Sequence, residues 1–309
     1  MILILGVTAS GKSRLAFDLA RQIDAEIVSI DSMKVYRRMD IGTAKPPVHA
    51  RDRLKYHLID VVEPSESFNV AAFLDRAETA IKQIKDRGKT VIAAGGTALY
   101  IKALLYGLFE GPGTDQQIRD QLIARAEAVG LEQLHQDLTQ IDPTAAERIH
   151  RNDARRIIRA LEVHKITGKP ISSFQKQWLD HTIAANKWTV IGVRRNRADA
   201  SARINRRVGQ MITSGLVPEV RSLLAEKVPL SEQARCAIGY AEMIDHIEGR
   251  MTLEQAAERI KINTRRLAKS QRTWFKTFRN INWLDIEAEE PPEQILQRAR
   301  GLLAKHGIQ

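Results

Sequence analysis

The chain has a single cysteine, Cys236, among its 309 residues. One cysteine cannot form a disulfide within the chain or supply a cysteine-based zinc site. No apolar run approaches the roughly 18 residues that a membrane span requires, and the sequence does not begin with the basic and apolar regions of a signal peptide. We also find no internal repeat and no low-complexity segment. These absences predict a cytoplasmic enzyme with no membrane partner. We also expect the protein to be monomeric.

An acidic residue is missing where a hydrolytic motor needs one. The apolar stretch KTVIAA, residues 89–94, is predicted to be a buried strand, and it is followed by Gly95, Gly96 and Thr97. A Walker-B strand ends in an acid, so a motor is disfavoured. Two glycines let the backbone approach a ligand closely, and Thr97 offers a hydroxyl, although a plain tight turn would use the same residues.

Positive charge is in excess. Lys and Arg number 48 against 37 Asp and Glu, a net charge of +11, which favours an acidic partner such as nucleic acid. The charge is concentrated in three segments, namely RNDARRIIRALEVHK at 151–165, RRNRADASARINRR at 194–207 and residues 259–279. The second segment has six arginines and one acid. We interpret the three as an extended nucleic-acid track, with a solvated basic surface as the alternative.

The third segment has the pattern of one amphipathic helix. It contains eight Lys or Arg and no acid. The basic residues Arg265, Lys269, Arg272, Lys276 and Arg279 recur at helical spacing, and Ile260, Leu267, Trp274 and Phe278 follow a different face. The spacing predicts a helix that packs through the apolar face and offers the cations to phosphates.

Near the amino terminus the sequence contains a phosphate-binding loop. The run GVTASGKS comprises Gly6, Val7, Thr8, Ala9, Ser10, Gly11, Lys12 and Ser13, and it fits the pattern G-x-x-x-x-G-K-[ST] of ATP-binding loops. An apolar strand precedes it and a helical pattern follows. Backbone N–H groups at a helix start, together with Lys12, attract an anion, and the Ser13 hydroxyl is a candidate ligand for Mg²⁺. The motif itself leaves open which phosphate is bound.

Short apolar strands alternate with helical patterns through most of the chain. MILIL, AEIVSI, KTVIAA and KWTVIGV read as strands, with INWLDI as one more short apolar run, and we predict helices at 13–23 and 69–85. This alternation predicts an α/β fold with a parallel sheet whose strand ends bring Gly6, Asp31 and Gly95 to one crevice. Residues 114–186 read as helices alone, so we predict an inserted helical domain there, with 1–113 and 187–309 forming the core.

Asp31 ends the second predicted strand and faces the phosphate loop. A carboxylate at this position can act as a base or hold Mg²⁺ through water. An N-cap formed by Asp31 or Ser32 would explain the same residues equally well.

Eight blocks resemble, in order and nearly in wording, the bacterial tRNA dimethylallyltransferase family, also called tRNA isopentenyltransferases. They are GVTASGKS, DSMKVYRRMDIGTAKP, YHLIDV, GGTALYIKALLYGL, DARRIIRALEV, GLVPEVRSLL, RCAIGYAEM and AKSQRTWFK. The resemblance spans almost the whole chain. It implies a P-loop NTPase-like core and transfer of a dimethylallyl group from its diphosphate to the N6 amine of the adenosine 3′ of the anticodon, with the phosphate loop holding the diphosphate.

The resemblance also assigns residues. Asp31 matches the family's general base, and Thr97 and Arg207 match residues near the diphosphate. Lys12 of the phosphate loop is a further catalytic candidate, because it can stabilise the charge that builds on the leaving diphosphate. The positions that match tRNA-contacting segments, besides Asp31 and Thr97, are Ser32, Met33, Lys34, Arg119, Arg155, Arg156, Ile157, Ile158, Arg159, Arg235, Cys236, Ala237, Ile238, Gly239, Tyr240, Lys269, Ser270, Gln271, Arg272, Thr273, Trp274, Phe275 and Lys276. A flipped base also needs side chains to stack against. Tyr36, Tyr100 and Tyr240 are candidates, with ordinary core packing expected for at least one of them.

Five positions depart from the family pattern. Proline is usual at Val7, glutamine at Lys34 and Arg155, an acid at Gly209 and arginine at Ser270. A lysine or arginine cannot accept a hydrogen bond from a base as glutamine can, so recognition of the bases next to the target is expected to differ.

Two other functions share parts of this sequence. A small-molecule or nucleotide kinase would use the same loop and Asp31, but it has no use for the basic helix. A nucleic-acid-binding ATPase would use the basic helix, but it needs the missing Walker-B acid.

Overall fold

A computed structural model describes residues 1–108, 111–175 and 187–308, and its main element is a parallel sheet. The strands are β1 Ile2–Gly6, β2 Ala25–Ile30, β3 Tyr56–His57, β4 Thr90–Gly95, β5 Thr189–Arg195 and β6 Ile281–Ile286, in the spatial order β3-β2-β4-β1-β5-β6. β1 and β2 are buried throughout, as expected for apolar strands covered on both faces. The predicted strands are confirmed, and β3 is one that the sequence analysis did not identify.

The carboxyl ends of the central strands meet as predicted. Leu5 of β1 and Ile30 of β2 both pair with Gly95 of β4, and Gly6 pairs with Val193 of β5. A Cβ atom on Gly95 would lie 2.0 Å from the carbonyl oxygen of Ile30. Glycine at this position therefore allows the close approach of the two strand ends.

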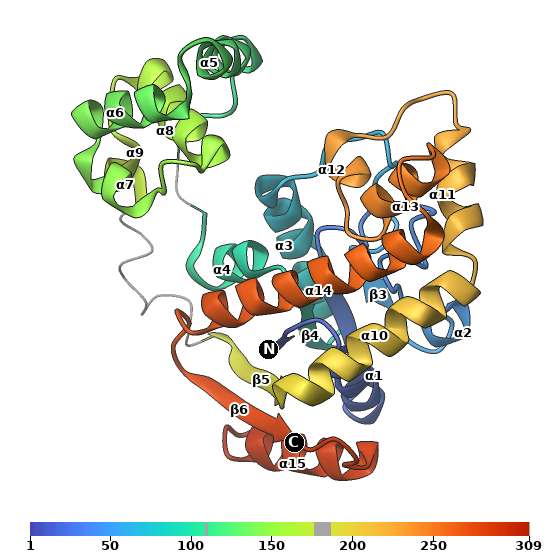
Figure 1. The fold of residues 1–309 in the computed structure, drawn as a ribbon. Coiled ribbons are helices and arrows are strands. Elements are labelled where there is room, and N and C mark those ends of the chain that lie inside the picture. The colour runs from blue at the N-terminus through green and yellow to red at the C-terminus, as the bar shows by residue number, and fades with distance from the viewer. Residues whose placement is uncertain (109–110, 176–186, 309) are drawn as a thin grey trace. The chain divides into compact units, whose positions relative to one another are not determined.

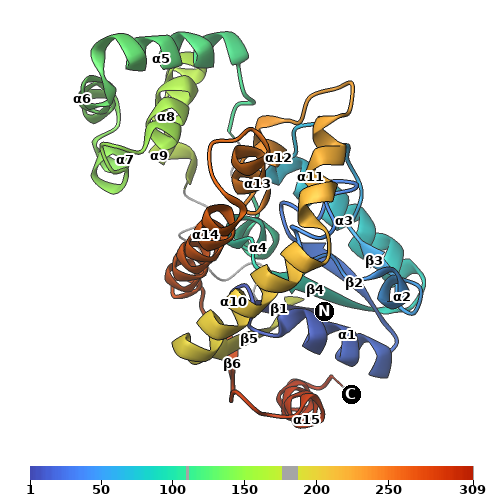
Figure 2. The same cartoon turned by 45° about the vertical axis from the view of Figure 1, so that its right-hand side comes forward.

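Helices cover both faces of the sheet (Figures 1 and 2). On one face α1, Lys12–Gln22, and α15, Pro292–Ala304, enclose a core that includes Ile4, Leu19 and Leu303. On the other face α3, Val70–Asp86, contacts β2 and β4. Asn69 caps α3 with its side chain, which agrees with the predicted start of this helix.

The remaining helices of this part follow β4 or β5, except for one short helix. They are α2 Val48–Arg51, α4 Ala98–Tyr106, α10 Arg197–Thr213, α11 Leu216–Leu224, α12 Glu232–Arg235, α13 Tyr240–Ile247 and α14 Leu253–Phe275. The long helix α14 packs against α10 and α13, and Figure 1 shows α10 and α14 running side by side. This packing brings two basic segments of the sequence together.

The chain divides into two compact units, Met1–Leu105 with Ala185–Gln309, and Tyr106–Ala184. The second unit contains α5 Gln116–Val129, α6 Leu131–Ile141, α7 Pro143–Arg148, α8 Ala154–Thr167 and α9 Ile171–Phe174. Its own core includes Leu122, Leu134, Leu138 and Ile157. The unit begins at Tyr106, ahead of the predicted residue 114, and the part of the predicted insertion at 176–186 lies outside the described residues.

No helix within the described ranges combines the length and the apolar character needed to cross a bilayer.

Candidate functional site: a phosphate loop beside an aspartate turn

The phosphate loop follows β1 directly and leads into α1. Ala9 has a φ of 63° and Gly11 a φ of 99°, and the N–H of Ser10 donates to the carbonyl of Val7 at 3.2 Å. A Cβ atom on Gly6 would lie 2.7 Å from the Ser10 Oγ. Glycine is therefore required at position 6 for the loop to close on itself, and the loop then presents the start of α1 to an anion.

Three arginines from β5 and α10 hold the outer side of this loop. Arg195 Nε donates to the carbonyl of Ser10 at 2.9 Å, and Arg203 Nε donates to that of Ala9 at 2.9 Å. Arg207 Nη1 donates to the hydroxyl of Thr8 at 3.3 Å. The placement of Arg207 beside the loop agrees with the prediction.

The interpretation of segment 194–207 as part of a nucleic-acid track is corrected for four of its arginines. Besides the three that contact the loop, Arg194 forms an ion pair with Asp285 at 2.6 Å and lies over the ring of Trp283. Because β5 and the start of α10 border both the loop and β6, these charges serve local contacts. Arg197 and Arg206 are exposed.

Several cations lie close to Lys12 of the phosphate loop. Burial and the neighbouring cations Lys34 and Arg207 lower the pKa of Lys12 to about 7, against the opposite influence of Asp31. The pKa of Lys34 is lowered too, by burial first and then by Arg207 and Lys45. Cations that lower one another's pKa form a site that favours an anion.

Asp31 forms a turn at the end of β2. Its Oδ1 accepts hydrogen bonds from the N–H groups of Met33 at 2.9 Å and Lys34 at 3.2 Å. The capping interaction considered from the sequence is present, at a turn rather than at a helix. Since both hydrogen bonds end on Oδ1, the turn does not use Oδ2, and a role as base is compatible with the cap.

Thr97 links this turn to the end of β4. The Thr97 hydroxyl oxygen accepts a hydrogen bond from the N–H of Ser32 at 3.1 Å, and the Thr97 N–H donates to the carbonyl of Ile30 at 3.4 Å. The predicted convergence of Gly6, Asp31 and Gly95 at one end of the sheet is thereby confirmed. Sequence reasoning placed Thr97 at the ligand, whereas the structure gives its hydroxyl a contact with the backbone.

A pocket of about 490 Å³ lies beside the phosphate loop. Ser13 and Lys34 line it together with apolar groups such as Phe17, Ile27 and Pro47. Its lining also includes charged residues, among them Arg14, Asp18 and Arg53, so it offers both cationic and apolar groups to a ligand.

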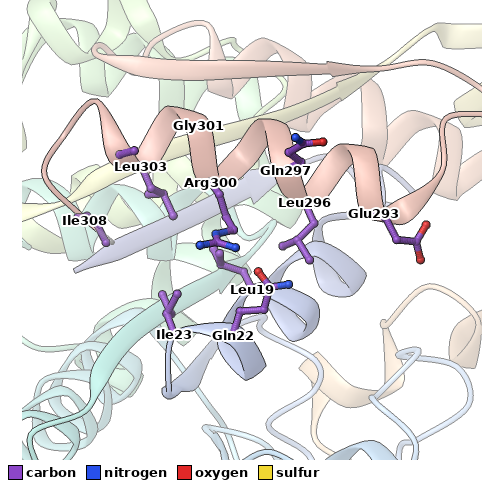
Figure 3. Close-up of a pocket in the computed structure, with 11 residues that line it drawn as sticks. Leu19, Gln22, Ile23, Glu293, Leu296, Gln297, Arg300, Gly301, Leu303 and Ile308 are labelled. Atoms are coloured by element: carbon purple, nitrogen blue, oxygen red, sulfur yellow. The ribbon is translucent and has the colours of Figure 1, made fainter.

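A second pocket has no residue of the phosphate loop. It measures about 560 Å³ and lies between α1 and α15, where Leu19 and Ile23 face Leu296 and Arg300 (Figure 3).

The three tyrosines considered as walls for a flipped base are buried. Tyr36 and Tyr240 are 0% exposed and Tyr100 is 5% exposed. Tyr100 stacks on Phe73 with ring centroids 4.4 Å apart, and the Tyr240 hydroxyl donates to Glu219 at 2.6 Å. The expected core packing is confirmed and extends to all three tyrosines, so none of them offers an open ring for a base.

Glu219 on α11 is a half-buried link that the sequence analysis missed. Its carboxylate accepts hydrogen bonds from the N–H groups of Asp40 at 3.0 Å, Ile41 at 2.8 Å and Gly42 at 3.2 Å. These bonds fix the loop after Tyr36 against α11 and Tyr240. A lone glutamate 177 to 179 residues from its partners gives no signal in the sequence.

Helix α14 differs from the predicted helix at both ends and on its apolar face. It spans Leu253–Phe275, so Arg279 lies beyond it, and Leu267 is 41% exposed. The buried residues are Ala256, Ile260, Ala268, Gln271 and Phe275. Leu267 and Trp274 follow Ile260 at seven-residue spacing, yet Leu267 is exposed and Trp274 is half-buried, so the predicted apolar face is wrong for Leu267.

The basic face of α14 is partly confirmed. Lys269 and Lys276 are exposed and Arg272 is half-buried. Arg265 instead pairs with Glu258 at 3.2 Å and donates to Asn205 at 2.7 Å. Ser270 and Thr273 are exposed beside this face. We define the basic stripe from here on as Lys269, Arg272 and Lys276.

The segment before α13 is divided between surface and interior. Arg235 and Cys236 are exposed and Ile238 is half-buried, whereas Ala237 and Gly239 are buried. Arg235 forms an ion pair with Glu248 at 3.1 Å. An RNA contact by this segment is therefore available to Arg235 and Cys236 and closed to the side chains of Ala237 and Tyr240.

In the second unit, two of the predicted RNA-contacting arginines surround a buried carboxylate. Glu162 is 0% exposed, and Arg119 and Arg159 donate to it at 3.0 and 2.9 Å. Burial raises the pKa of Glu162, but hydrogen bonds from Arg159, the N–H of Asp115 and Arg119 outweigh burial and lower it. Arg119 and Arg159 therefore stabilise the fold of this unit.

The other residues of α8 that were predicted to contact RNA differ in how exposed their side chains are. Arg155 and Arg156 are exposed, Ile158 is half-buried and Ile157 is buried. Ile157 belongs to the core of the unit. A contact with RNA by its side chain is excluded, because that side chain has no surface.

One candidate ligand for Mg²⁺, the Ser13 hydroxyl, lies in the phosphate loop. Among the described residues no group of three or more His, Cys, Asp or Glu could hold a metal ion. Mg²⁺ commonly keeps several waters and takes one or two protein ligands plus phosphate oxygens. The Ser13 hydroxyl, exposed at the start of α1, is compatible with such a site.

Relatives of this chain share one type of enzyme name. A sequence model of the family described as IPP transferase matches residues 34–278. The tRNA dimethylallyltransferase of Geobacter metallireducens is 46% identical over 287 residues, covering 92% of this chain and 92% of that protein. The tRNA dimethylallyltransferase of Acetivibrio thermocellus is 41% identical over 309 residues, covering 100% and 98%.

Solved structures agree with the sequence relatives. The full-length tRNA isopentenylpyrophosphate transferase of Bacillus halodurans is similar with a TM-score of 0.71 and 39% identity, covering 98% of this chain and 95% of that chain. A eukaryotic dimethylallyltransferase acting on tRNA is similar with a TM-score of 0.79 and 26% identity, covering 99% and 79%. The fold is thus the predicted P-loop NTPase-like α/β fold, and the chain belongs to the IPP transferase family.

Proposed function

We propose that this protein transfers a dimethylallyl group from dimethylallyl diphosphate to the N6 amine of the adenosine 3′ of the anticodon in tRNA, releasing diphosphate. The observation that carries the proposal is the position of the Asp31 carboxylate beside a cation-rich phosphate loop, in a chain whose relatives are named for this transfer. The relatives reported above are named for this transfer and not for a kinase or an ATPase.

Asp31 is the proposed general base. The exocyclic amine of adenine is a poor nucleophile because its lone pair is delocalised into the ring, so a carboxylate must take its proton as the new C–N bond forms. The turn that fixes Oδ1 on Met33 and Lys34 holds the carboxylate in one orientation, with Oδ2 proposed to accept the proton.

The phosphate loop is proposed to stabilise the leaving diphosphate. As the allylic C–O bond breaks, negative charge develops on the diphosphate, and Lys12, Arg207 and the N–H groups at the start of α1 oppose it. Mg²⁺ bound with the diphosphate through Ser13 would neutralise more of this charge. Thr97 contributes by holding Ser32, and with it the turn of Asp31, in place.

The pocket beside the loop is proposed to receive the dimethylallyl group. Ser13 and Lys34 are among its polar lining residues, and Phe17, Ile27 and Pro47 are among its apolar ones. Lys34 stands where the resemblance led us to expect glutamine, and its positive charge is proposed to favour the diphosphate.

RNA is proposed to bind through exposed cations in both units. The proposed contacts are the basic stripe, in which Lys269 and Lys276 are exposed and Arg272 is half-buried, together with the exposed Arg155, Arg156 and Arg235. The target base must leave its stack to reach Asp31.

Ligand-induced thermal stabilisation tests the proposal. A ligand that binds the folded state raises the melting temperature, and at equal concentration the tighter ligand gives the larger rise. Dimethylallyl diphosphate with Mg²⁺ is expected to give a larger rise than ATP with Mg²⁺ at equal concentration, and Lys12→Ala is expected to remove that rise. A larger rise with ATP would favour a kinase or ATPase and contradict the proposal.

A further inference from the structure

Gln271 lies in the α14 segment expected to contact tRNA, but its side chain faces the phosphate loop. The residue is 8% exposed. Its Oε1 accepts a hydrogen bond from the N–H of Thr8 at 2.9 Å, and its Nε2 donates to the carbonyl of Gly96 at 2.8 Å. One buried amide thus joins three segments that are far apart in sequence, namely the phosphate loop, the end of β4 and α14.

The fit of this amide depends on glycine at position 96. A Cβ atom there would lie 2.6 Å from Gln271 Nε2 and 3.3 Å from the carbonyl oxygen of Gly6. Both partners of Gln271 are backbone groups, one donor and one acceptor, so a side chain must accept and donate at once. Among side chains of this length, only glutamine does both.

Its neighbours in sequence face the other way. Lys269 is exposed and Arg272 is half-buried on the basic stripe, while Gln271 is directed into the protein. The same turn of α14 therefore carries proposed RNA contacts on its outer side and a phosphate-loop contact on its inner side.

We propose that Gln271 is a positioning residue for the diphosphate site, and that it sets the geometry of the phosphate loop rather than reading RNA. It occupies the N–H of Thr8 and fixes the first turn of the loop against Gly96. The N–H groups at the start of α1 are then left in a constant direction for the anion. The inference rests on the proposed function, since it assigns the diphosphate of dimethylallyl diphosphate to this loop.

Two substitutions of Gln271 remove its two hydrogen bonds in different combinations. Gln271→Leu removes both bonds at similar volume, whereas Gln271→Glu keeps an acceptor for Thr8, loses the donor for Gly96 and adds a negative charge beside the loop. We expect KM and Kd for dimethylallyl diphosphate to rise about tenfold for Leu and further for Glu, with the Kd for anticodon stem-loop RNA within twofold of wild type.

Lys269→Ala is the matched control two residues away. It is expected to weaken RNA binding and to leave the affinity for dimethylallyl diphosphate unchanged. Gly96→Ala, which disturbs the same contact from the opposite side, is expected to reproduce the Gln271→Leu pattern, and it provides a second test if Gln271→Leu folds poorly.

Calorimetric titration with dimethylallyl diphosphate and Mg²⁺ decides the outcome. If wild type binds and both Gln271→Leu and Gly96→Ala bind equally well, the positioning role is wrong while the proposed function stands. If the Gln271 variants lose RNA affinity and keep diphosphate affinity, Gln271 reads RNA and the inference is overturned. If the wild-type protein itself does not bind dimethylallyl diphosphate, the proposed function is contradicted, and the inference about Gln271 falls with it.

Discussion

The hydroxyl oxygen of Thr97 accepts a hydrogen bond of 3.1 Å from the backbone N–H of Ser32, 65 residues earlier in the chain. This bond ties the start of α4 to the turn that holds the proposed base, Asp31. The two residues stand at the ends of adjacent strands, since Ile30 of β2 pairs with Gly95 of β4.

Replacing Thr97 should therefore affect catalysis through position. Thr97→Val leaves the N–H of Ser32 without its partner, and we expect kcat to fall about tenfold, because a lost hydrogen bond of this kind is worth about 1–2 kcal/mol. Thr97→Ser keeps the hydroxyl and should retain most of the rate. Single-turnover rates with saturating RNA and diphosphate would measure this. Equal rates for Val and Ser would show that the hydroxyl has no positioning role.

Substitution of Asp31 separates its two roles. Asp31→Asn keeps Oδ1 as acceptor for Met33 and Lys34 but cannot take a proton, so we expect the single-turnover rate to fall by about a hundredfold to ten-thousandfold with an unchanged melting temperature. Asp31→Ala should lose the rate and also about 1 kcal/mol of stability. RNA affinity should stay within a few fold for both, because a base acts on the transition state. An Asn variant with more than half the rate would reduce Asp31 to a cap.

The lowered pKa of Lys12 predicts a pH dependence of diphosphate binding. In the free protein Lys12 has a pKa of about 7, and a bound diphosphate favours the charged lysine, so binding takes up a proton when the pH is above 7. Affinity for dimethylallyl diphosphate should consequently fall as pH rises from 7 to 9, by up to about tenfold for each pH unit. Lys12→Arg keeps its charge over this range and should flatten the profile. The same slope in both proteins would assign the dependence to another group.

The basic stripe should set the salt dependence of RNA binding. Each phosphate that Lys269, Arg272 or Lys276 neutralises releases counterion and contributes about 0.7 to the slope of log affinity against log salt on single strands, and about 0.9 on duplex DNA. Arg272→Ala and Lys276→Ala should each lower the slope by about this amount and leave the modified adenosine unchanged. Arg265→Ala is the control on the same helix, because Arg265 is engaged with Glu258 and Asn205.

An unchanged slope in both stripe variants would place α14 away from the RNA. A changed site of modification would mean that these residues read bases instead of phosphates.

The features that could be predicted from the sequence are those formed by residues close together in the chain. The strand, loop and helix around Gly6 to Ser13 are contiguous in sequence, and Asn69 directly precedes the helix that it caps. In a parallel sheet the carboxyl ends of the strands lie at one edge. Gly6, Asp31 and Gly95 could therefore be assigned to one edge of the sheet from the sequence alone.

Contacts between distant segments could not be predicted in the same way. Arg203 meets the loop 194 residues away and Gln271 meets it 263 residues away, and nothing in the composition near either residue indicates its partner. The six-arginine segment looked like an RNA track because charge density does not show which cations are already paired within the protein.

Side-chain direction was the other source of error. Leu267 shared the spacing of Ile260, yet α14 turns it to the surface. Tyr240 looked available for stacking because the sequence gives no sign of Glu219 behind it. Burial is a property of the packed chain, and it separates Ile157 from Arg156 although the two are adjacent.

Analysis of the nucleosides after reaction tests the central claim most directly. Wild-type protein would be incubated with an anticodon stem-loop RNA, dimethylallyl diphosphate and Mg²⁺ without ATP, and the RNA would then be digested and analysed by mass spectrometry. We predict one N6-dimethylallyladenosine at the position 3′ of the anticodon, one diphosphate released for each modified nucleoside, and no product with a stem-loop carrying guanosine there. Unmodified RNA under these conditions, or modification that required ATP and released ADP or orthophosphate, would contradict the account.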